Sequence, residues 1–397
     1  MKTYCIAAAA LLASAPAFAQ MDSVTAFNTD NEKGLIQSIA KIEKKTDAFN
    51  LYFNMHGNFK ADWNGSHFNE GKFQMQQFRI EAKGRIAPWV SYRYRQRVNK
   101  GDDPKGYRDN LWNSIDLAEI MLNFGKWDIA LGKQCAAYGG IEFDLNPIEI
   151  YQYSDMVDYM TNFMSGVTVG YNFTGRQQLQ FQILNAYNTT SRAMYGDYEK
   201  SKLPMVYTLN WNGNFSDVYK TRWSASVMSE TKGAQMYYFA LGNDFKISDK
   251  VGAYFDWMYS REGVDRKGIM TSIVGGTDPL KNTAKAEYMS FILHFNYRFL
   301  PDWNIFCKLM YENEGIYKTH KAQYDGEERD IRAGKYRTAL GYIGGVEYYP
   351  FKDRNLHFYA TYIGRDYLYT AKAKSFGMEN YTTNCLQIGF IWQMPVF

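Results

Sequence analysis

From Leu51 to the C-terminus, apolar and polar residues alternate along the chain with a period of two. The stretch 89–99, WVSYRYRQRVN, shows the pattern clearly, because its tyrosines fall on one parity and its three arginines on the other. Successive side chains of a strand point to opposite faces, so this segment has one aromatic face and one face that carries guanidiniums. Two folds accommodate such a strand. In a soluble sandwich the arginines face solvent, and in a membrane barrel they face an aqueous lumen.

The connections between the alternating segments favour the barrel. The segments lie near 51–60, 78–86, 89–99, 115–124, 127–133, 166–174, 178–186, 205–212, 219–229, 235–246, 251–261, 288–299, 303–313, 337–349, 355–366 and 385–396. From the second segment onward, short and long connections alternate, except for a short one at 230–234. Bacterial membrane barrels have short periplasmic turns and longer outer loops, whereas a sandwich has no reason for this alternation. The sequence therefore predicts an all-β fold, a transmembrane antiparallel up-and-down β-barrel of about sixteen strands over residues 51–397.

Composition supports a membrane barrel and excludes several other classes. The chain has 33 tyrosines, 26 phenylalanines and 9 tryptophans, although its mean hydropathy is −0.45. Alternating strands flanked by aromatic girdles require this combination. The net charge of +4 is too small to indicate a nucleic-acid partner. Cys135, Cys307 and Cys385 have no paired spacing, so we expect no metal or other cofactor. The sequence does not decide whether two of the three form a disulfide.

The N-terminal residues predict export. Residues 1–19 combine a basic start, a short apolar run and a final Ala-x-Ala motif, which is typical of a secretory signal peptide. Residues 20–50 are predicted to form a periplasmic segment with a short heptad helix, because Leu35, Ile39 and Ile42 recur at helical spacing. A helix this short needs partners, such as the same segment of neighbouring barrels in a trimer. A charged linker fits the same residues.

Six basic residues on two neighbouring segments share the parity opposite to the apolar set, and we predict that they line the pore. They are Arg79, Lys83, Arg85, Arg93, Arg95 and Arg97. Like charges stacked along a strand repel one another on a dry face, so this face is expected to be wet. Guanidiniums bind phosphate and carboxylate as bidentate forks. Anion recognition and generic lumen polarity, partly neutralised by Glu81, both fit these residues.

The segment 134–165 is the longest connection, and it contains no lysine or arginine. Its acidic residues are Glu142, Asp144, Glu149, Asp155 and Asp158. Its many apolar side chains indicate that it packs, and the barrel interior is the available place. Folded inward, it is expected to narrow the lumen and to set acids across from the arginines of 89–99, which creates a transverse field. An acidic loop on the outside of the barrel is the alternative.

Nothing in the sequence points to catalysis. Ser290 and His294 share a strand face, but residues four apart on a strand lie roughly 13 Å apart, beyond hydrogen-bonding reach. The sequence contains no glycine-rich phosphate loop, HExxH motif or paired cysteines. We therefore expect no catalytic residues and no enzymatic activity.

Two stretches also carry a family resemblance: FRIEAKGRIAPWVSYRYRQR at 78–97 and GGIEFDLNPIEIYQYSDM at 139–156. Together with the signal peptide, the heptad segment and the GKQ that opens the long loop, they resemble the phosphate-selective porin O and P family of Bacteroides-type bacteria. The resemblance implies a sixteen-stranded, trimeric outer-membrane channel with its third outer loop folded inside, and an arginine ladder that draws anions in. The acid-rich loop and the small net charge depart from a strongly anion-selecting pattern.

We therefore expect an outer-membrane porin that allows passive diffusion of small hydrophilic solutes and ions, with a preference for anions or phosphate. Its expected partners are outer-membrane lipid, the solutes and two further copies of the chain. The alternative is an outer-membrane surface or adhesion protein with a blocked lumen.

Overall fold

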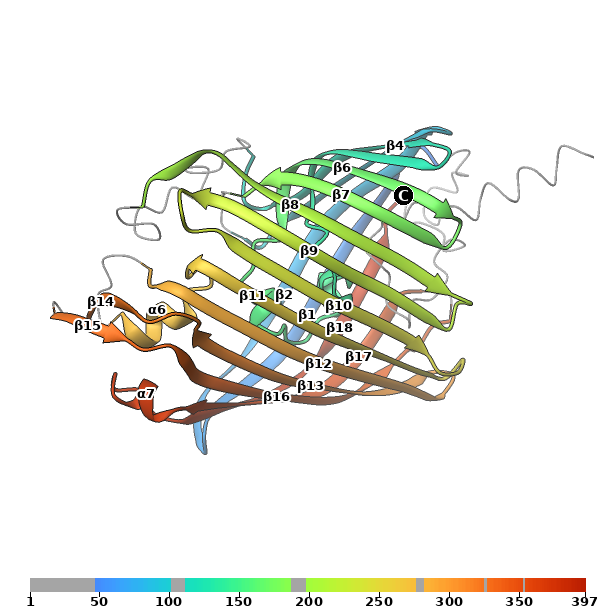
Figure 1. The fold of residues 1–397 in the computed structure, drawn as a ribbon. Coiled ribbons are helices and arrows are strands. Elements are labelled where there is room, and N and C mark those ends of the chain that lie inside the picture. The colour runs from blue at the N-terminus through green and yellow to red at the C-terminus, as the bar shows by residue number, and fades with distance from the viewer. Residues whose placement is uncertain (1–46, 101–110, 187–197, 276–281, 325–326, 353) are drawn as a thin grey trace, which may run out of the picture.

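The computed structural model describes residues 47–100, 111–186, 198–275, 282–324, 327–352 and 354–397. Sixteen strands form a closed antiparallel barrel, in which each strand pairs with its sequence neighbour except around a long outer hairpin (Figure 1). The predicted fold class is thus confirmed for the barrel. The predicted signal peptide and nearly all of the segment 20–50, including its helix, lie outside the described residues.

The barrel strands are longer than the alternating segments from which they were predicted. They are β1 (Asn50–Asn64), β2 (His67–Ala87), β3 (Val90–Arg97), β4 (Ile115–Phe124), β5 (Trp127–Cys135), β6 (Phe163–Thr174), β7 (Gln177–Asn185), β8 (Lys200–Phe215), β9 (Tyr219–Thr231), β10 (Met236–Lys246), β11 (Val251–Val264), β12 (Ala284–Leu300), β13 (Trp303–Ile316), β16 (Gly334–Tyr348), β17 (Leu356–Tyr369) and β18 (Tyr381–Pro395). A separate two-stranded sheet consists of β14 (His320–Tyr324) and β15 (Glu327–Ile331).

The first hairpin shows why the strands extend further. Residues between Lys60 and Phe78, to which the alternation assigned no strand, continue β1 and β2 up to a tight turn at Gly65. Gly65 has a φ of 58°, a conformation that glycine adopts without strain. At its other edge β1 pairs with β18, from Tyr52 opposite Pro395 to Asn64 opposite Thr383, and this pairing closes the barrel.

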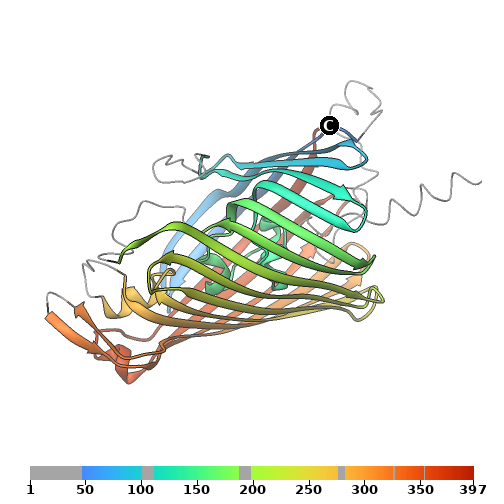
Figure 2. The ribbon, with the colours of Figure 1, turned by 45° about the horizontal axis from the view of Figure 1, so that its top comes forward.

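The two faces of the wall follow the predicted alternation. Along β13, Ile305 and Leu309 are exposed on the outside, whereas Phe306 and Lys308 are buried on the inside. The outer face is therefore the apolar surface that meets lipid, and the inner face carries the polar and charged side chains. The β14–β15 hairpin projects beyond the rim at the end of the long loops (Figure 2).

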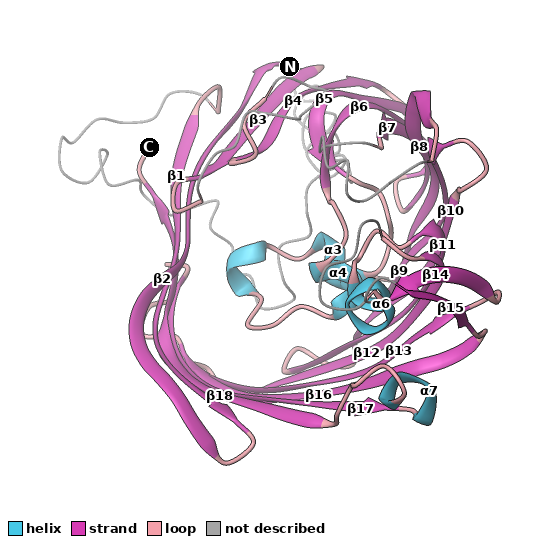
Figure 3. Ribbon diagram, turned by 90° about the vertical axis from the view of Figure 1, so that its left-hand side faces the viewer, coloured by secondary structure: helices cyan, strands magenta, loops and turns pink. Residues whose placement is uncertain are grey.

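In the described parts of the long connections lie five short helices: α3 (Ile141–Asp144), the 3-10 helix η2 (Pro147–Glu149), α4 (Asp155–Asp158), α6 (Ile269–Val274) and α7 (Ala371–Lys374). None of the helices in the described part of the chain is long and apolar enough to cross a membrane. The first three belong to the connection between β5 and β6, residues 136–162, which we call loop L3. Seen from the long-loop end, α3 and α4 lie inside the ring of strands (Figure 3).

Loop L3 builds an apolar core inside the barrel. Its side chains Tyr138, Ile141, Ile148 and Met156 are fully buried and belong to one cluster with residues of the wall and of α6. Burial of apolar area stabilises such packing by about 25 cal/mol per Å². The loop thus occupies one side of the lumen, and the remaining free space lies around it.

Candidate functional site: the lumen around loop L3

Local sequence signals shape loop L3. The Asn146 side chain accepts a hydrogen bond from the backbone N–H of Ile148 at the start of η2, and Pro147 occupies the first position, where no N–H is needed. The Ser154 hydroxyl caps α4 in the same way by accepting from the N–H of Val157. These caps break the loop into three short turns, so its side chains project toward several parts of the wall.

One tether of loop L3 is a buried ion pair with β13. The Lys308 ammonium contacts the Glu142 carboxylate and donates to the backbone carbonyl of Gln152 over 2.8 Å. The Ser154 hydroxyl also donates to Glu142, over 2.5 Å. Since Glu142 is only 1% exposed, this carboxylate depends on the lysine and the serine for its stabilisation.

A second tether joins α4 to two arginines of the wall. Asp155 contacts Arg337 of β16 and lies 2.9 Å from Arg365 of β17, measured from its Oδ1 to Nη2. Its backbone N–H donates to Glu312 of β13 over 2.6 Å, and Glu312 in turn accepts from Arg365 over 2.5 Å. The arginines are thus held between one carboxylate of the loop and those of β13, Glu314 included.

The backbone of α3 sits directly on the wall. The N–H groups of Ile141 and Glu142 donate to the two carboxylate oxygens of Asp256 over 2.7 and 2.9 Å. A Cβ atom at Gly242 of β10 would lie 2.6 Å from the Cα of Gly140, so only glycine permits this approach. Asp144 adds a 2.7 Å ion pair to Arg222 of β9.

The predicted arginines face the lumen from the opposite wall, where acids of the wall itself accompany them. Asp116 of β4 lies within ion-pair distance of Arg79, Arg95 and Arg97, at 2.9, 3.4 and 3.0 Å. The Arg93 side chain donates to Glu81 over 2.7 Å. Three guanidiniums therefore share one carboxylate, and the wall retains positive charge.

The other two predicted basic residues lie apart from this group. The Lys83 ammonium lies 5.0 Å from the centre of the Tyr52 ring, and Arg85 is exposed near the short-turn end of β2. The loop acids were expected to lie across from the arginines of 89–99, but the ion pairs of the loop are formed elsewhere. Glu142, Asp144 and Asp155 pair instead with basic residues of β13, β9, β16 and β17.

A cavity of about 640 Å³ lies between the arginine wall and loop L3, and we call it the outer chamber. Arg79, Arg97 and Asp158 line it, together with Tyr151 and Gln152. Asp158 is the one acid of the loop that faces this space from an exposed position. Although the Asp158 side chain is accessible, the protein around it partly desolvates its carboxylate, and this desolvation together with the nearby carboxylates of Asp155 and Glu142 raises the pKa of Asp158.

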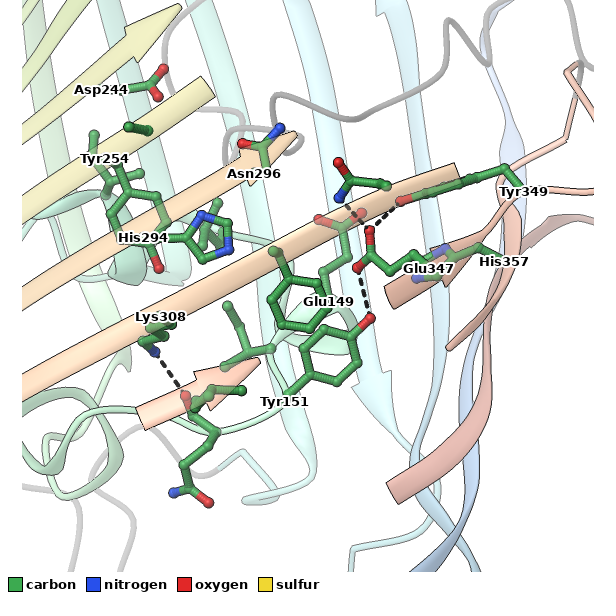
Figure 4. Close-up of a pocket in the computed structure, with 18 residues that line it drawn as sticks. Glu149, Tyr151, Asp244, Tyr254, His294, Asn296, Lys308, Glu347, Tyr349 and His357 are labelled. Carbon is green, nitrogen blue, oxygen red and sulfur yellow. Dashed lines mark hydrogen bonds between the residues drawn. The ribbon is translucent and has the colours of Figure 1, made fainter. Parts of the chain in front are cut away.

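Two further cavities adjoin the outer chamber at loop L3. A cavity of about 510 Å³ lies along β1, β17 and β18, with Arg365 and Gln152 in its lining. A smaller cavity of about 90 Å³ lies beyond the loop toward the short-turn end, and Glu149, Tyr151 and Gln152 are among the residues around it (Figure 4). Gln152 is common to the linings of these three cavities.

Several residues of this site were not singled out from the sequence. Lys308, Arg337 and Arg365 lie on three neighbouring strands, β13, β16 and β17. The same parity count that found the arginines of β3 would have placed Lys308 inside. The sequence did not show Asp116 as a partner of the arginines, for a different reason. A register shift between Arg95 and Gln96 places it within reach of the arginines, and sequence spacing does not reveal such a bulge.

No group of three histidine, cysteine or acidic side chains among the described residues could hold a metal ion. Cys135, Cys307 and Cys385 are all free thiols.

The family comparison decides what this lumen belongs to. A family model, phosphate-selective porin O and P, matches residues 49–394. The chain belongs to this family. It is therefore an outer-membrane, porin-like channel, and porins are not enzymes. No curated protein matches the sequence.

Solved structures show the same fold at low sequence identity. This porin is similar to the outer-membrane channel DcaP of Acinetobacter baumannii, with a TM-score of 0.57, 13% identity, and coverage of 87% of this chain and 96% of the other. An anion-selective porin from Comamonas acidovorans gives a TM-score of 0.54 at 7% identity, covering 87% and 99%. The trimer form of OmpT from Vibrio cholerae gives 0.51 at 10% identity, covering 87% and 100%.

Proposed function

We propose that this porin allows passive diffusion of small hydrophilic solutes and ions, with a moderate preference for anions. The observation that carries the proposal is the outer chamber, where Arg79 and Arg97 face free space across from loop L3. A cleft lined by an excess of one sign of charge raises the local concentration of the opposite ion. Because Asp116 offsets part of the positive charge, the preference is expected to be moderate.

The guanidiniums also suit phosphate, which they bind as bidentate forks. The family's name and the anion-selective relative from Comamonas acidovorans support this direction. Three acids of loop L3, Glu142, Asp144 and Asp155, are held by basic residues elsewhere in the wall, and of the loop acids only Asp158 faces the chamber from an exposed position, so most of the arginine face is accessible to an anion. We propose that phosphate passes through the outer chamber more readily than its charge and size alone would allow.

Planar-bilayer recording tests the proposal. Purified protein should give discrete ion steps, and the reversal potential in a potassium chloride gradient should indicate anion preference. Replacement of Arg93, Arg95 and Arg97 by alanine should lower this preference, and the milder single change Arg97→Gln should lower it less. Arg176→Ala is the matched control, because Arg176 lies on a short turn and pairs with the exposed Asp217. An unchanged ion preference in the triple variant would contradict the assignment of these side chains to the conducting path.

The blocked-lumen surface protein remains the second candidate, because the apolar packing of loop L3 and α6 fills one side of the barrel. A barrel that inserts into the bilayer and gives no ion steps would favour it over the porin. We also propose a homotrimer, which the trimer form of the structural relative OmpT supports. Chemical cross-linking in native membranes should give a ladder that ends at three chains, and a single band would refute the trimer.

A further inference from the structure

Two basic side chains lie together on the lipid-facing side of the barrel, at the long-loop end of β11 and β12, which run side by side (Figure 1). Arg261 of β11 is exposed between Ser260 and Glu262, which are fully buried on the lumen side. Lys285 of β12 lies on the same outer side as Arg261, because both cations approach the ring of Tyr317. We call Arg261, Lys285 and Tyr317 the rim site.

The rim site lies at the height where the apolar band of the barrel ends. On β11 outward and inward residues alternate from Val251, near the short turn, to Arg261. An advance of about ten residues at about 3.3 Å each, on a strand tilted by about 40°, rises about 25 Å, which is the height of the apolar band of a membrane barrel. Tyr237 of β10 lies opposite Arg261, is 42% exposed and belongs to the aromatic girdle at this edge. The rim site therefore faces the headgroups of outer-leaflet lipid.

One tyrosine holds the two cations close to each other. The Arg261 Cζ atom lies 4.6 Å from the centre of the Tyr317 ring, and the Lys285 ammonium lies 6.0 Å from it. Lys285 has a φ of 59°, a conformation that residues with a Cβ atom rarely adopt, and its carbonyl accepts from the Tyr317 N–H over 2.9 Å. The backbone thus holds a rare conformation at the residue whose side chain joins Arg261. Two like charges near one ring repel each other, so the arrangement favours an anion that both can contact.

The charge around the rim site is positive in excess. Within the part of the chain that the structure describes, neither Arg261 nor Lys285 forms an ion pair. Glu287 of β12 is the acid opposite Arg261, and its carboxylate accepts from the Tyr259 hydroxyl over 3.1 Å. Lys335 of β16 is exposed further along the same row of paired residues and adds a third cation. A positive patch at headgroup height attracts anionic lipid.

We infer that the rim site binds an anionic lipid of the outer leaflet by its phosphate group. Arg261 offers a planar fork to the phosphate oxygens, and Lys285 adds a point charge beside it. The acyl chains of the lipid lie along the outward apolar residues below, among them Phe291 and Tyr311, which are paired across β12 and β13. The inference goes beyond the proposed passage of solutes, because neither cation lines the three lumen cavities described above.

Lipid A is the probe, and lipid A from which the phosphates have been removed enzymatically is the comparison. Native mass spectrometry of the purified protein in detergent should show saturable binding of lipid A and much weaker binding of the dephosphorylated form. Arg261→Gln and Lys285→Gln should each raise the dissociation constant about fivefold, and the double variant about twenty-five-fold. Lys285→Arg keeps the charge and should bind as the wild type does. Lys250→Gln is the matched control, because Lys250 is an exposed lysine at the short-turn end of β11.

Circular dichroism and cooperative thermal unfolding establish that each variant folds. Equal affinity for the two forms of lipid A, or unchanged affinity in the double variant, would overturn the inference and leave the proposed function standing. Inorganic phosphate that displaces lipid A at a concentration equal to that of the lipid would show a site for free anions and would also overturn the inference. A barrel that binds lipid A in this way but gives no ion steps in bilayers would support the inference and overturn the proposed function alone.

Discussion

Lys308→Met tests whether loop L3 is held in place by the ion pair that the structure shows. The lysine is 5% exposed and supplies a charge to Glu142 and a hydrogen bond to the Gln152 carbonyl, both of which belong to the loop. Removal of one partner from a buried pair leaves the other charge uncompensated and costs about 3–5 kcal/mol. Because Lys308 is on the wall and both partners are on the loop, we expect this cost to fall on docking of the loop.

A cost of about 3–5 kcal/mol raises the open population of the loop by about 150-fold to 5,000-fold. Hydrogen exchange of the amides of 141–158, followed by mass spectrometry, measures this local opening directly. In bilayers the same variant should show larger open-channel noise. The global unfolding temperature should change little, because the barrel ladder is intact.

The double variant Glu142→Gln with Lys308→Met is the control. It removes both charges, and replacement of a whole buried pair is often nearly neutral, so amide exchange should return most of the way to that of the wild type. Exchange in Lys308→Met that equals the wild-type rate would refute the tether. Exchange in the double variant that is as fast as in the single variant would show that the charge of Glu142 is not the cause.

Three further predictions concern charge and space in the lumen. Asp116→Asn removes the carboxylate that three guanidiniums share, so the anion preference measured by reversal potential should rise; a fall would contradict the pairing. The raised pKa of Asp158 means that its carboxylate gains a proton at a higher pH than an ordinary aspartate. The anion preference should therefore rise as pH falls through that pKa, and this pH dependence should be absent in Asp158→Asn. Because the pKa is higher in the folded state, protonation of this group also raises the free energy of unfolding as pH falls. Gly242→Ala places a Cβ 2.6 Å from the Cα of Gly140 and should displace loop L3 and raise single-channel conductance, whereas Gly344→Ala, which meets no atom within 4 Å, should conduct as the wild type does.

The fold was predictable because its signal is repeated in every strand. The alternation of β13, with Leu309 outside and Lys308 inside, occurs with variations around the whole barrel, and errors at single boundaries do not change the result. The length of β2 was missed because His67–Lys72 lies at the exposed tip of the first hairpin, where neither lipid nor lumen imposes a pattern on the side chains.

The site was predictable only where its partners share a strand. The arginines of β3 could be recognised from their spacing, but the acid that joins them, Asp116, depends on a bulge in the pairing of β3 with β4. The partners of the loop acids are distant in the sequence: Arg337 lies 182 residues from Asp155, and Lys308 lies 166 residues from Glu142. A pairing of that kind follows from the closure of the barrel and leaves no local pattern.

Gln152 is a useful position for engineering the lumen. Because it contributes to the linings of three cavities, a group attached at this residue can alter all three. A cysteine installed there would let a thiol-reactive reagent of chosen size narrow the lumen in an otherwise intact barrel. The flux of solutes through the lumen could then be measured as a function of the length of the attached group, which would make this protein a tunable nanopore.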